Sequence, residues 1–548
     1  MARHHTIALG SETYEPDESL TAPSDQPSTL VAAEGETSNE VALGLRLRSV
    51  LPHLVDGPPP ARDSDPAADA GLTLDLLVAS VAAHPTNDRI WLLMTAICAA
   101  FPTRNDVDHV RRMLELRDHT GSAIGLLDSC RSIVSDRGEP GATVEILHHG
   151  VVVDVDHTAK SDLHTGIQRV SRSLLPLWGA QRDVVPTGWT EAGGALRRLL
   201  PTELDRVVGW LSGQRGGRHT DATAEPTSLD PPPRILIPWR SVVVMVEVPA
   251  AEVADRLAAI GDYSGNRLVG VFYDAIPVVS ADMVPSEDSS KFVRYLTSVK
   301  FAARMAGVSA AATAEMNGFV RALATQGLPG PQVVEVALGS PSTAAFSVKR
   351  PSGDGDPMVL VVGSHEPRKN HLAILHSAEI LWREGLRFSL LFIGGSGWGD
   401  EFPRRTAALQ LAGRPLQVRR AVPEAELERA YSSAAFTVFP SLHEGFGLPV
   451  AESLLHGTPV ITSNFGSTAE IGGQGGTLLV DPRDHPSLTN AMRILLTDPV
   501  VLERLRAEIA ARPERTWQDY ADELWENLVE PELDELIRGT RNGRQNDR

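Results

Sequence analysis

The fold is decided by residues 436–463, which read FTVFPSLHEGFGLPVAESLLHGTPVITS. An apolar run ends at Pro440, a turn with two glycines follows at 445–447, and a helix is expected to begin near Pro449. Proline suits the first helical turn, where its missing N–H is not needed, and glycine permits tight turns and the close approach of a ligand. The segment predicts a strand, a glycine turn and a helix, followed by the next strand at 459–462.

This alternation of strand and helix extends in both directions, and it predicts two sheets. Between 347 and 511 we expect strands at 358–362, 388–393, 416–419, 436–439, 459–462 and 477–480, and helices near 371–384, 402–412, 424–433, 449–456 and 485–497. Between 146 and 346 we expect strands at 150–156, 234–237, 242–246, 267–273 and 332–336, with an inserted loop at 212–233. Strand–helix alternation implies parallel sheets covered by helices. The expected fold class is α/β, with two Rossmann-like domains facing a cleft, because ligands bind outside the carboxyl ends of such strands.

The first 145 residues differ in composition from the rest. Residues 1–70 are rich in Ser, Thr, Pro and acidic residues, which predicts a disordered segment that the fold can lose. Residues 71–145 show helical spacing, with apolar side chains along one face of 90–101. We expect a small helical extension there, with a structural or docking role.

Charge and cysteine content exclude several classes of protein. The net charge of -19 makes the chain a poor general binder of nucleic acid. Cys98 and Cys130 form no CxxC pair, and no Cys/His cluster has zinc spacing. The start of the chain has no apolar core of signal-peptide length, and no apolar run reaches a membrane span of ~20 residues. We expect a cytoplasmic protein without a transmembrane segment, and a peripheral membrane contact stays open.

Two carboxylates flank the expected helix start at Pro449. Glu444 precedes the turn, and Glu452 is expected in the first helical turn. The unpaired N–H groups of a helix start suit an anion, and carboxylates beside such a site suit hydroxyl groups that flank a phosphate. Arg368 and Lys369, shortly after the strand at 358–362, can neutralise a diphosphate. The alternatives are that Glu452 only complements the helix dipole and that the two cations are a solvated surface pair.

The segments HEGFGLPVAES and VGSHEPRKN together resemble the retaining glycosyltransferases of family four, which have the two-domain GT-B fold. The resemblance covers about residues 148–535 and is strongest after residue 345. It implies that Glu444 contacts the transferred sugar and that Glu452 contacts the ribose. The donor diphosphate and sugar would then be held by Arg368, Lys369, and the backbone N–H groups of Phe446, Gly447 and Leu448. The glycine-rich turn at 393–400 is interpreted as lining the same cleft.

The amino half resembles the family in two places. DHTAKSDLHTGIQRVSRSLL looks like the glycine loop after the first strand, which puts Gly166 near the phosphates and Thr165 and Arg169 near the cleft. YDAIP resembles a segment in which many members carry His where this chain has Tyr273, so Asp274 is the remaining catalytic candidate. In GT-B enzymes a carboxyl-terminal helix crosses back to the first domain, and the apolar face of 512–535 suits that role.

The resemblance implies transfer of a mannose-, glucose- or rhamnose-like hexose from a nucleotide-diphosphate sugar to a glycan or other hydroxyl acceptor, with retention. No cofactor other than this co-substrate is expected. The alternatives are a GT-B epimerase or phosphorylase, and an inactive nucleotide-sugar-binding scaffold. Asp154 and Asp156 form an Asp-x-Asp sequence of the kind that holds a divalent ion. Because cations and a helix start already suit the phosphates, we expect no metal.

Overall fold

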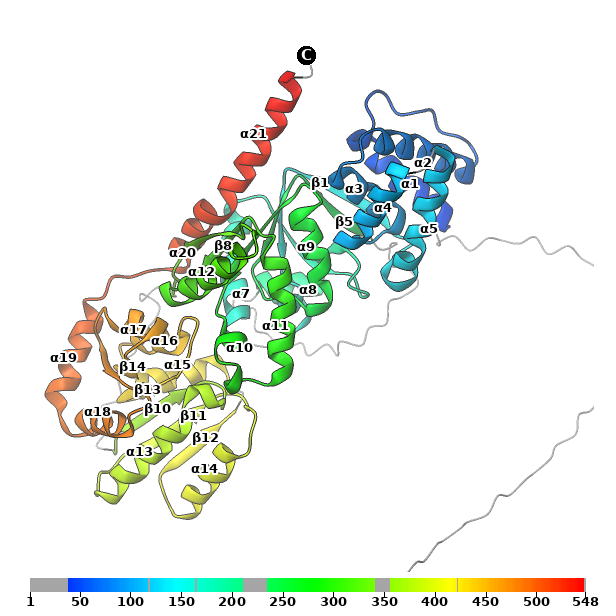
Figure 1. The fold of residues 1–548 in the computed structure, drawn as a ribbon. Helices are drawn as coiled ribbons and strands as arrows, with labels where there is room; N and C mark the ends of the chain where they lie inside the picture. Colours follow the sequence, from blue (N-terminus) through cyan, green and yellow to red (C-terminus); the bar gives the residue numbers. More distant parts are fainter. Residues whose placement is uncertain are drawn as a thin grey trace, which may run out of the picture.

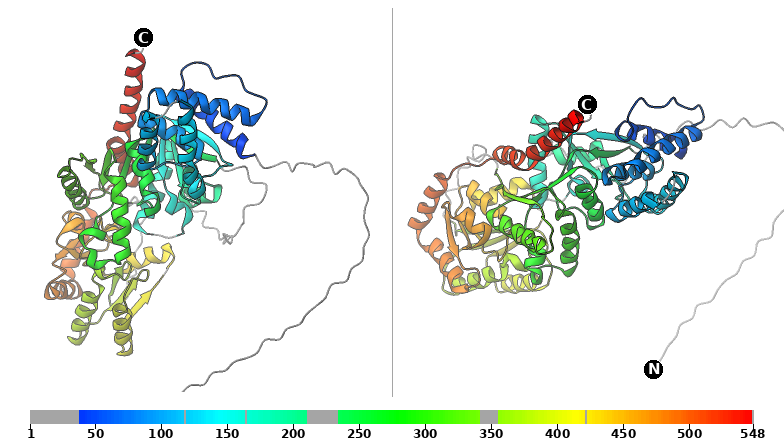
Figure 2. Two further views of the ribbon diagram at one scale, coloured as in Figure 1. Left: turned by 45° about the vertical axis from the view of Figure 1, so that its right-hand side comes forward. Right: turned by 45° about the horizontal axis from the view of Figure 1, so that its top comes forward.

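The computed structural model describes residues 38–116, 119–162, 165–209, 234–340, 355–420 and 422–546. The inserted loop expected at 212–233 and most of the linker expected at 347–357 lie outside these residues. Figure 1 and Figure 2 show two α/β units, with helices α1–α5 packed on the end of the first unit that lies away from the second.

The first unit is built on a sheet of strand order β1-β5-β4-β3-β2-β6-β7-β8-β9. Its pairs are parallel except those of β4, which runs antiparallel to β3 and β5. The strands are β1 (Thr143–His148), β2 (Val151–Asp154), β3 (Val184–Trp189), β4 (Leu196–Arg198), β5 (Arg234–Trp239), β6 (Val242–Met245), β7 (Arg267–Phe272), β8 (Arg304–Gly307) and β9 (Gln332–Glu335). The helices that follow them are α6 (Asp156–Lys160), α7 (Gly166–Gln181), α8 (Pro201–Val208), α9 (Ala254–Asp262), α10 (Ile276–Val279), α11 (Ser286–Val299) and α12 (Ala310–Ala324).

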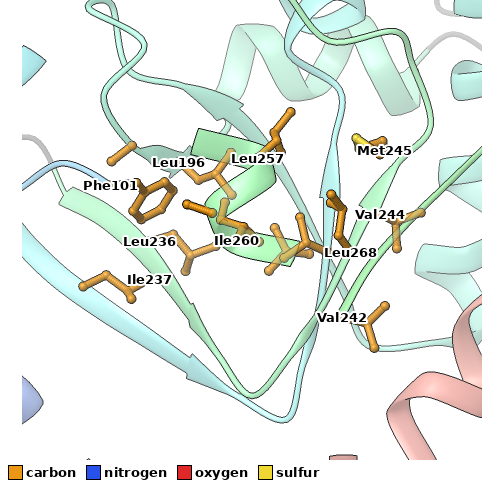
Figure 3. Packing of buried hydrophobic residues seen from close by; sticks show 14 of the residues in the cluster. Phe101, Leu196, Leu236, Ile237, Val242, Val244, Met245, Leu257, Ile260 and Leu268 are labelled. Carbon is orange, nitrogen blue, oxygen red and sulfur yellow. The ribbon is translucent and has the colours of Figure 1, made fainter. Parts of the chain in front are cut away.

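Continuous apolar runs form the centre of this sheet because both of its faces are covered. Every residue of β2 and of β6 is buried, as expected of parallel strands between two layers of helices. Figure 3 shows Leu236 of the sheet beside Ile260 of α9. Phe101, which follows α3, lies in the same cluster, so the helical extension shares its core with the first unit.

The helical extension is longer than the sequence predicted. It consists of α1 (Asn39–Leu54), α2 (Pro66–Ala83), α3 (Asn87–Cys98), α4 (Arg104–Leu116) and α5 (His119–Arg137). Disorder was expected over 1–70. This is wrong for 39–54, because α1 buries apolar side chains against α2 and α3, and for 66–70, which form the start of α2. Residues 55–65 link α1 to α2 without a helix or strand, and residues 1–37 of that expectation lie outside the described residues. Arg46 of α1 is buried and donates to the carbonyl oxygens of Ala96, Pro140 and Ala142.

One helix of the described part of the chain, α2, is long and apolar enough by length and composition to cross a membrane. The sequence had indicated no such stretch. In the structure α2 packs against α1 and α5, and Leu74, Leu77 and Val81 are buried.

The second unit contains a parallel sheet of order β12-β11-β10-β13-β14-β15. Its strands are β10 (Met358–Val362), β11 (Ser389–Ile393), β12 (Leu416–Arg419), β13 (Phe436–Phe439), β14 (Val460–Ser463) and β15 (Thr477–Val480). Its helices are α13 (His371–Arg383), α14 (Glu401–Leu411), α15 (Glu424–Ser433), α16 (Leu448–Leu455), α17 (Gly466–Gly472), α18 (His485–Thr497) and α19 (Pro499–Ala510). The α/β class with two sheet-based units is confirmed, and the first sheet departs from the expected parallel arrangement only at β4. The strands and helices expected here are all present, and α17 and α19 are additional.

The carboxyl-terminal segment returns to the first unit. It comprises α20 (Trp517–Leu524), a π-helical turn η6 (Trp525–Val529) and α21 (Glu530–Asn546). Trp178 of α7 donates its indole N–H to the carbonyl of Ala521 at 2.9 Å, and Tyr520 and Leu528 are buried in the core of the first unit.

Candidate active site

The loop between β13 and α16 is one place where the two units meet. Gly447 has φ +107°, a conformation that glycine adopts without strain, and Pro449 lies in the first turn of α16. A Cβ atom on Gly445 would stand 2.1 Å from the carbonyl oxygen of Tyr273 in the first unit. The glycine turn therefore allows the second unit to press its loop against the end of β7.

Glu444 lies within this loop as the centre of an ion-pair cluster. Its Oε1 is 2.5 Å from Nζ of Lys369, and its Oε2 is 3.0 Å from Nη1 of Arg368. Arg368 is also paired with Glu366, with 2.7 Å between Nε and Oε2. The side chains of Glu444 and Lys369 are 10% and 9% exposed, so the pair is largely removed from water. The structure therefore brings together three residues that the sequence predicted for one site.

The charges in this cluster are set by burial and by neighbouring ions. Burial alone would raise the pKa of Glu444, but Lys369 and Arg368 outweigh it and lower this pKa to about 2. Burial lowers the pKa of Lys369, and Glu444 opposes that change. Glu444 is accordingly ionised at neutral pH, and an ionised carboxylate is an acceptor for hydroxyl groups.

Arg368 and Lys369 occupy a short 3₁₀ turn, η5 (Pro367–Lys369), between β10 and α13. The glycine-rich turn at 393–400 packs directly on this segment. A Cβ atom on Gly394 would lie 1.9 Å from the carbonyl oxygen of Gly363, and one on Gly397 would lie 1.9 Å from that of His365. The structure thus places this turn beside the segment that carries the two cations.

Asp274 brings a carboxyl group of the first unit to the same cluster. It follows β7, and its Oδ1 accepts the N–H of Ile276 at 3.0 Å. A Cβ atom on Gly445, the residue after Glu444, would stand 3.2 Å from Cβ of Asp274, so the two segments are in contact. Burial raises the pKa of Asp274, while Arg368 lowers it and Glu444 raises it. Tyr273 donates its hydroxyl to the carbonyl of Val246 at 2.7 Å and is buried.

Glu452 differs from the expectation in its position and its partners. It lies in the second turn of α16 instead of the first. The alternative that its charge serves only to complement the helix dipole at the amino end therefore does not explain its position. Its Oε2 accepts the hydroxyl of Tyr431 at 2.8 Å, and its Oε1 pairs with Arg169 of α7. Glu452 is therefore joined to the first unit in this structure.

The start of α7 faces the start of α16 across the boundary between the units. Thr165 caps α7, and Gln168 accepts the N–H of Thr165 at 2.9 Å. A Cβ atom on Gly166 would stand 3.1 Å from Cδ1 of Leu448. Phe446 and Leu448 pack against the core of the first unit. Gly166, Phe446, Gly447 and Leu448 thus gather where the two helix starts approach each other.

Asp154 and Asp156 lie outside this cluster, and both carboxylates accept hydrogen bonds from neighbouring groups of the protein. Asp154 is buried and accepts the indole N–H of Trp189 at 3.0 Å. Asp156 accepts the backbone N–H of Trp189 at 2.7 Å and pairs with Lys160 at 2.6 Å. Within the described ranges, no group of three or more His, Cys, Asp or Glu side chains is arranged to hold a metal ion.

Sequence reasoning missed three of the side chains that join the two units, namely His443, Ser280 and Glu315. His443 contacts Ser280 and Glu315, both of the first unit. His443 could have been found as the neighbour of Glu444, but Glu315 belongs to a helix whose sequence, AAATAEMNGFVRALA, carries no signal of a site.

Comparison with known proteins identifies the second unit. Residues 343–512 match the model of the family glycosyl transferases group 1. The second unit is a glycosyl transferases group 1 domain. The Glu444 cluster and the start of α16 both lie within this domain.

Similar proteins include two bacterial mannosyltransferases. The chain is 35% identical over 131 residues to O-antigen chain mannosyltransferase B of Escherichia coli, covering 24% of this chain and 34% of that protein. It is 25% identical over 328 residues to serotype-specific mannosyltransferase WbdA of Escherichia coli, covering 57% and 38%. The chain thus spans little more than a third of the length of either relative. Among solved structures, sucrose-phosphate synthase from Thermosynechococcus elongatus has a TM-score of 0.47 and 16% identity, and the match covers 69% of this chain and 97% of that one.

Proposed function

We propose that this protein is a retaining glycosyltransferase. It moves a mannose-, glucose- or rhamnose-like hexose from a nucleotide-diphosphate sugar to a glycan or another hydroxyl acceptor. The observation that carries the proposal is the cluster of Glu444, Lys369 and Arg368 beside the start of α16, with the Asp274 segment of the first unit packed against the same loop. Family membership of the second unit and its mannosyltransferase relatives support the same chemistry.

The proposed donor site uses both cations and the helix start. Arg368 and Lys369 would bind the diphosphate, which the unpaired N–H groups of Phe446, Gly447 and Leu448 would also contact. Glu444 would accept sugar hydroxyl groups. Glu452 would accept a ribose hydroxyl in place of one of its present partners.

The proposed reaction needs charge stabilisation and positioning. The bond between the sugar C1 and the diphosphate oxygen breaks, and the diphosphate leaves with the electron pair. The acceptor oxygen bonds to C1 on the same face, and its proton passes to the departing phosphate oxygen. Arg368 and Lys369 would stabilise the charge that grows on that oxygen. Asp274 would orient the acceptor or stabilise positive charge on the sugar.

The proposal includes transfer without a metal ion. The cations and helix start described above can balance the diphosphate charge, and Asp154 and Asp156 are already bound by Trp189 and Lys160. Turnover in excess EDTA tests this part.

Two measurements on the full chain test the function. Thermal-shift screening against UDP-, GDP- and other nucleotide sugars identifies the donor, because a ligand that binds only the folded state raises the melting temperature. NMR of the product made from that donor then reads the anomeric configuration. Transfer with retention supports the proposal. An epimerised free sugar would identify an epimerase, and donor binding without turnover would identify an inactive nucleotide-sugar-binding scaffold. Absence of both binding and turnover would overturn the proposal.

A further inference from the structure

His443, the residue that precedes Glu444, bridges two side chains of the first unit. Its Nε2 lies 2.6 Å from Oε1 of Glu315 on α12, and its Nδ1 lies 2.7 Å from Oγ of Ser280 after α10. The side chains of His443 and Glu315 are 16% and 18% exposed. Figure 1 shows α10 where the first unit faces the second.

Glu315 extends this bridge to the segment of Asp274. Its second oxygen, Oε2, accepts the backbone N–H of Ala275 at 2.6 Å. The hydrogen-bonded connection therefore runs from Ala275 through Glu315 to His443. Ala275 is the covalent neighbour of Asp274, and His443 is the covalent neighbour of Glu444, the two carboxyl residues that the proposed reaction uses.

The hydrogen-bonding capacity of the three side chains fits this arrangement. A neutral imidazole with its hydrogen on Nε2 donates to Glu315 and accepts the Ser280 hydroxyl at Nδ1. A protonated ring still donates from Nε2, so the bridge does not require one charge state. Glu315 raises the pKa of His443, with smaller contributions from Asp274 and Glu444, in keeping with this contact.

We propose that Glu315 and His443 are a positioning pair that fixes the segment of Asp274 against the loop of Glu444. The inference rests on the proposed function, in which these two carboxyl groups act on the bound substrates from opposite units. A misplacement of about 1 Å between reacting groups can lower a rate by about a hundredfold. The pair acts on the relative position of the units, whereas Arg368 and Lys369 act on the diphosphate within one unit.

Glu315→Gln in the full chain tests the pair, with Glu470→Gln as the matched control. Glu470 also joins the units, because it accepts the N–H groups of Ala310 and Ala311 at 3.0 and 2.8 Å, but it does not touch the segments of Asp274 or Glu444. Hydrogen exchange of residues 273–280 and 441–448 is measured in both variants by mass spectrometry. We expect Glu315→Gln to speed exchange at least tenfold in both peptides, and Glu470→Gln to change it less than twofold.

Kinetics separate positioning from donor binding. We expect Glu315→Gln to lower kcat at least tenfold and to leave the affinity for the free nucleoside diphosphate within twofold. His443→Asn should have a similar effect, and the double variant should lose no more than twofold beyond either single one. Faster exchange in 273–280 alone, with kcat unchanged, would overturn the pair while leaving the proposed function in place. If the wild-type chain transfers no sugar, the proposed function fails. The exchange rate of 441–448 in Glu315→Gln then decides by itself whether the pair holds the two units together, and an unchanged rate there would overturn the pair.

Discussion

Replacing Glu444 by Gln should weaken catalysis and strengthen binding of the free nucleoside diphosphate. In the structure the carboxylate holds the two cations that the diphosphate would use, at 2.5 and 3.0 Å. A diphosphate bound to Arg368 and Lys369 would lie ~5 Å from Glu444, where two unit charges repel by ~3 kcal/mol at an effective dielectric constant of about 20. Removing this repulsion should tighten nucleoside diphosphate binding at least tenfold, with ~150-fold as the upper bound. Loss of the hydroxyl contact should lower turnover by roughly 5- to 150-fold, which corresponds to ~1–3 kcal/mol.

Calorimetry, thermal unfolding and transfer kinetics at pH 7 check this prediction. The pKa of Glu444 is about 2, so the stability that its ion pairs contribute is complete above pH ~4.5 and is lost as the pH falls toward 2. At pH 7 the unliganded variant should be less stable, by up to ~3 kcal/mol, because two buried cations lose their carboxylate. Added nucleoside diphosphate should recover that loss. Equal weakening of turnover and nucleoside diphosphate binding would refute the reasoning, because it would mean that Glu444 supports the diphosphate site instead of competing for it.

Four further predictions concern the diphosphate, the metal, the ionisation of Asp154 and the amino terminus. Arg368→Ala should weaken binding of the nucleoside diphosphate by calorimetry and leave binding of the nucleoside unchanged; an equal loss for both would indicate misfolding. Transfer should persist in excess EDTA, and Asp154→Asn should leave donor affinity unchanged. Burial raises the pKa of Asp154 to about 7, so the folded wild-type protein loses stability as the pH rises from ~4 to 7. Asp154→Asn does not lose this stability, so its melting temperature minus that of wild type should increase between pH 5 and pH 8. A difference that stays constant over this range would contradict the prediction. Deletion of 2–37 should leave the melting temperature unchanged. Deletion of 2–70 should unfold the helical extension, because each fully buried aliphatic side chain of α1 contributes ~1.5–3 kcal/mol to stability. A 2–70 deletion that is folded and active would contradict this prediction.

The strands of the second unit could be predicted from sequence because each is a short apolar run between helices. The first unit was harder to predict. β3 contains Pro186, which argues against a strand, and β4 has only three residues. α1 was missed because Ser- and Pro-rich stretches on both sides dominate the composition of 1–70. Its apolar positions, including Leu47, Val50 and Leu54, follow helical spacing that composition does not register.

The candidate site could be predicted only where its residues lie in local motifs. Glu444, Arg368 and Lys369 stand at strand ends, where parallel sheets carry their sites, and the structure gathers them. Glu315 and the partnership of Arg169 with Glu452 depend on how one unit sits on the other. No spacing within the sequence encodes that relation, so these contacts required coordinates.

The return of the chain to the first unit makes the second unit an insertion. The two connecting segments meet at one point, where Ser340 donates its N–H to the carbonyl of Arg515 at 2.9 Å and Arg515 donates to the carbonyl of Ala337 at 2.7 and 2.9 Å. A Cβ atom on Gly339 would stand 2.2 Å from the carbonyl oxygen of Thr516. A chimera that exchanges the second unit with that of a relative must therefore be cut twice, on the second-unit side of this junction. A single crossover would separate α20 and α21 from the core of the first unit that they complete. Recombination between such chains should therefore preserve the fold only when the exchanged segment is bounded by both cuts.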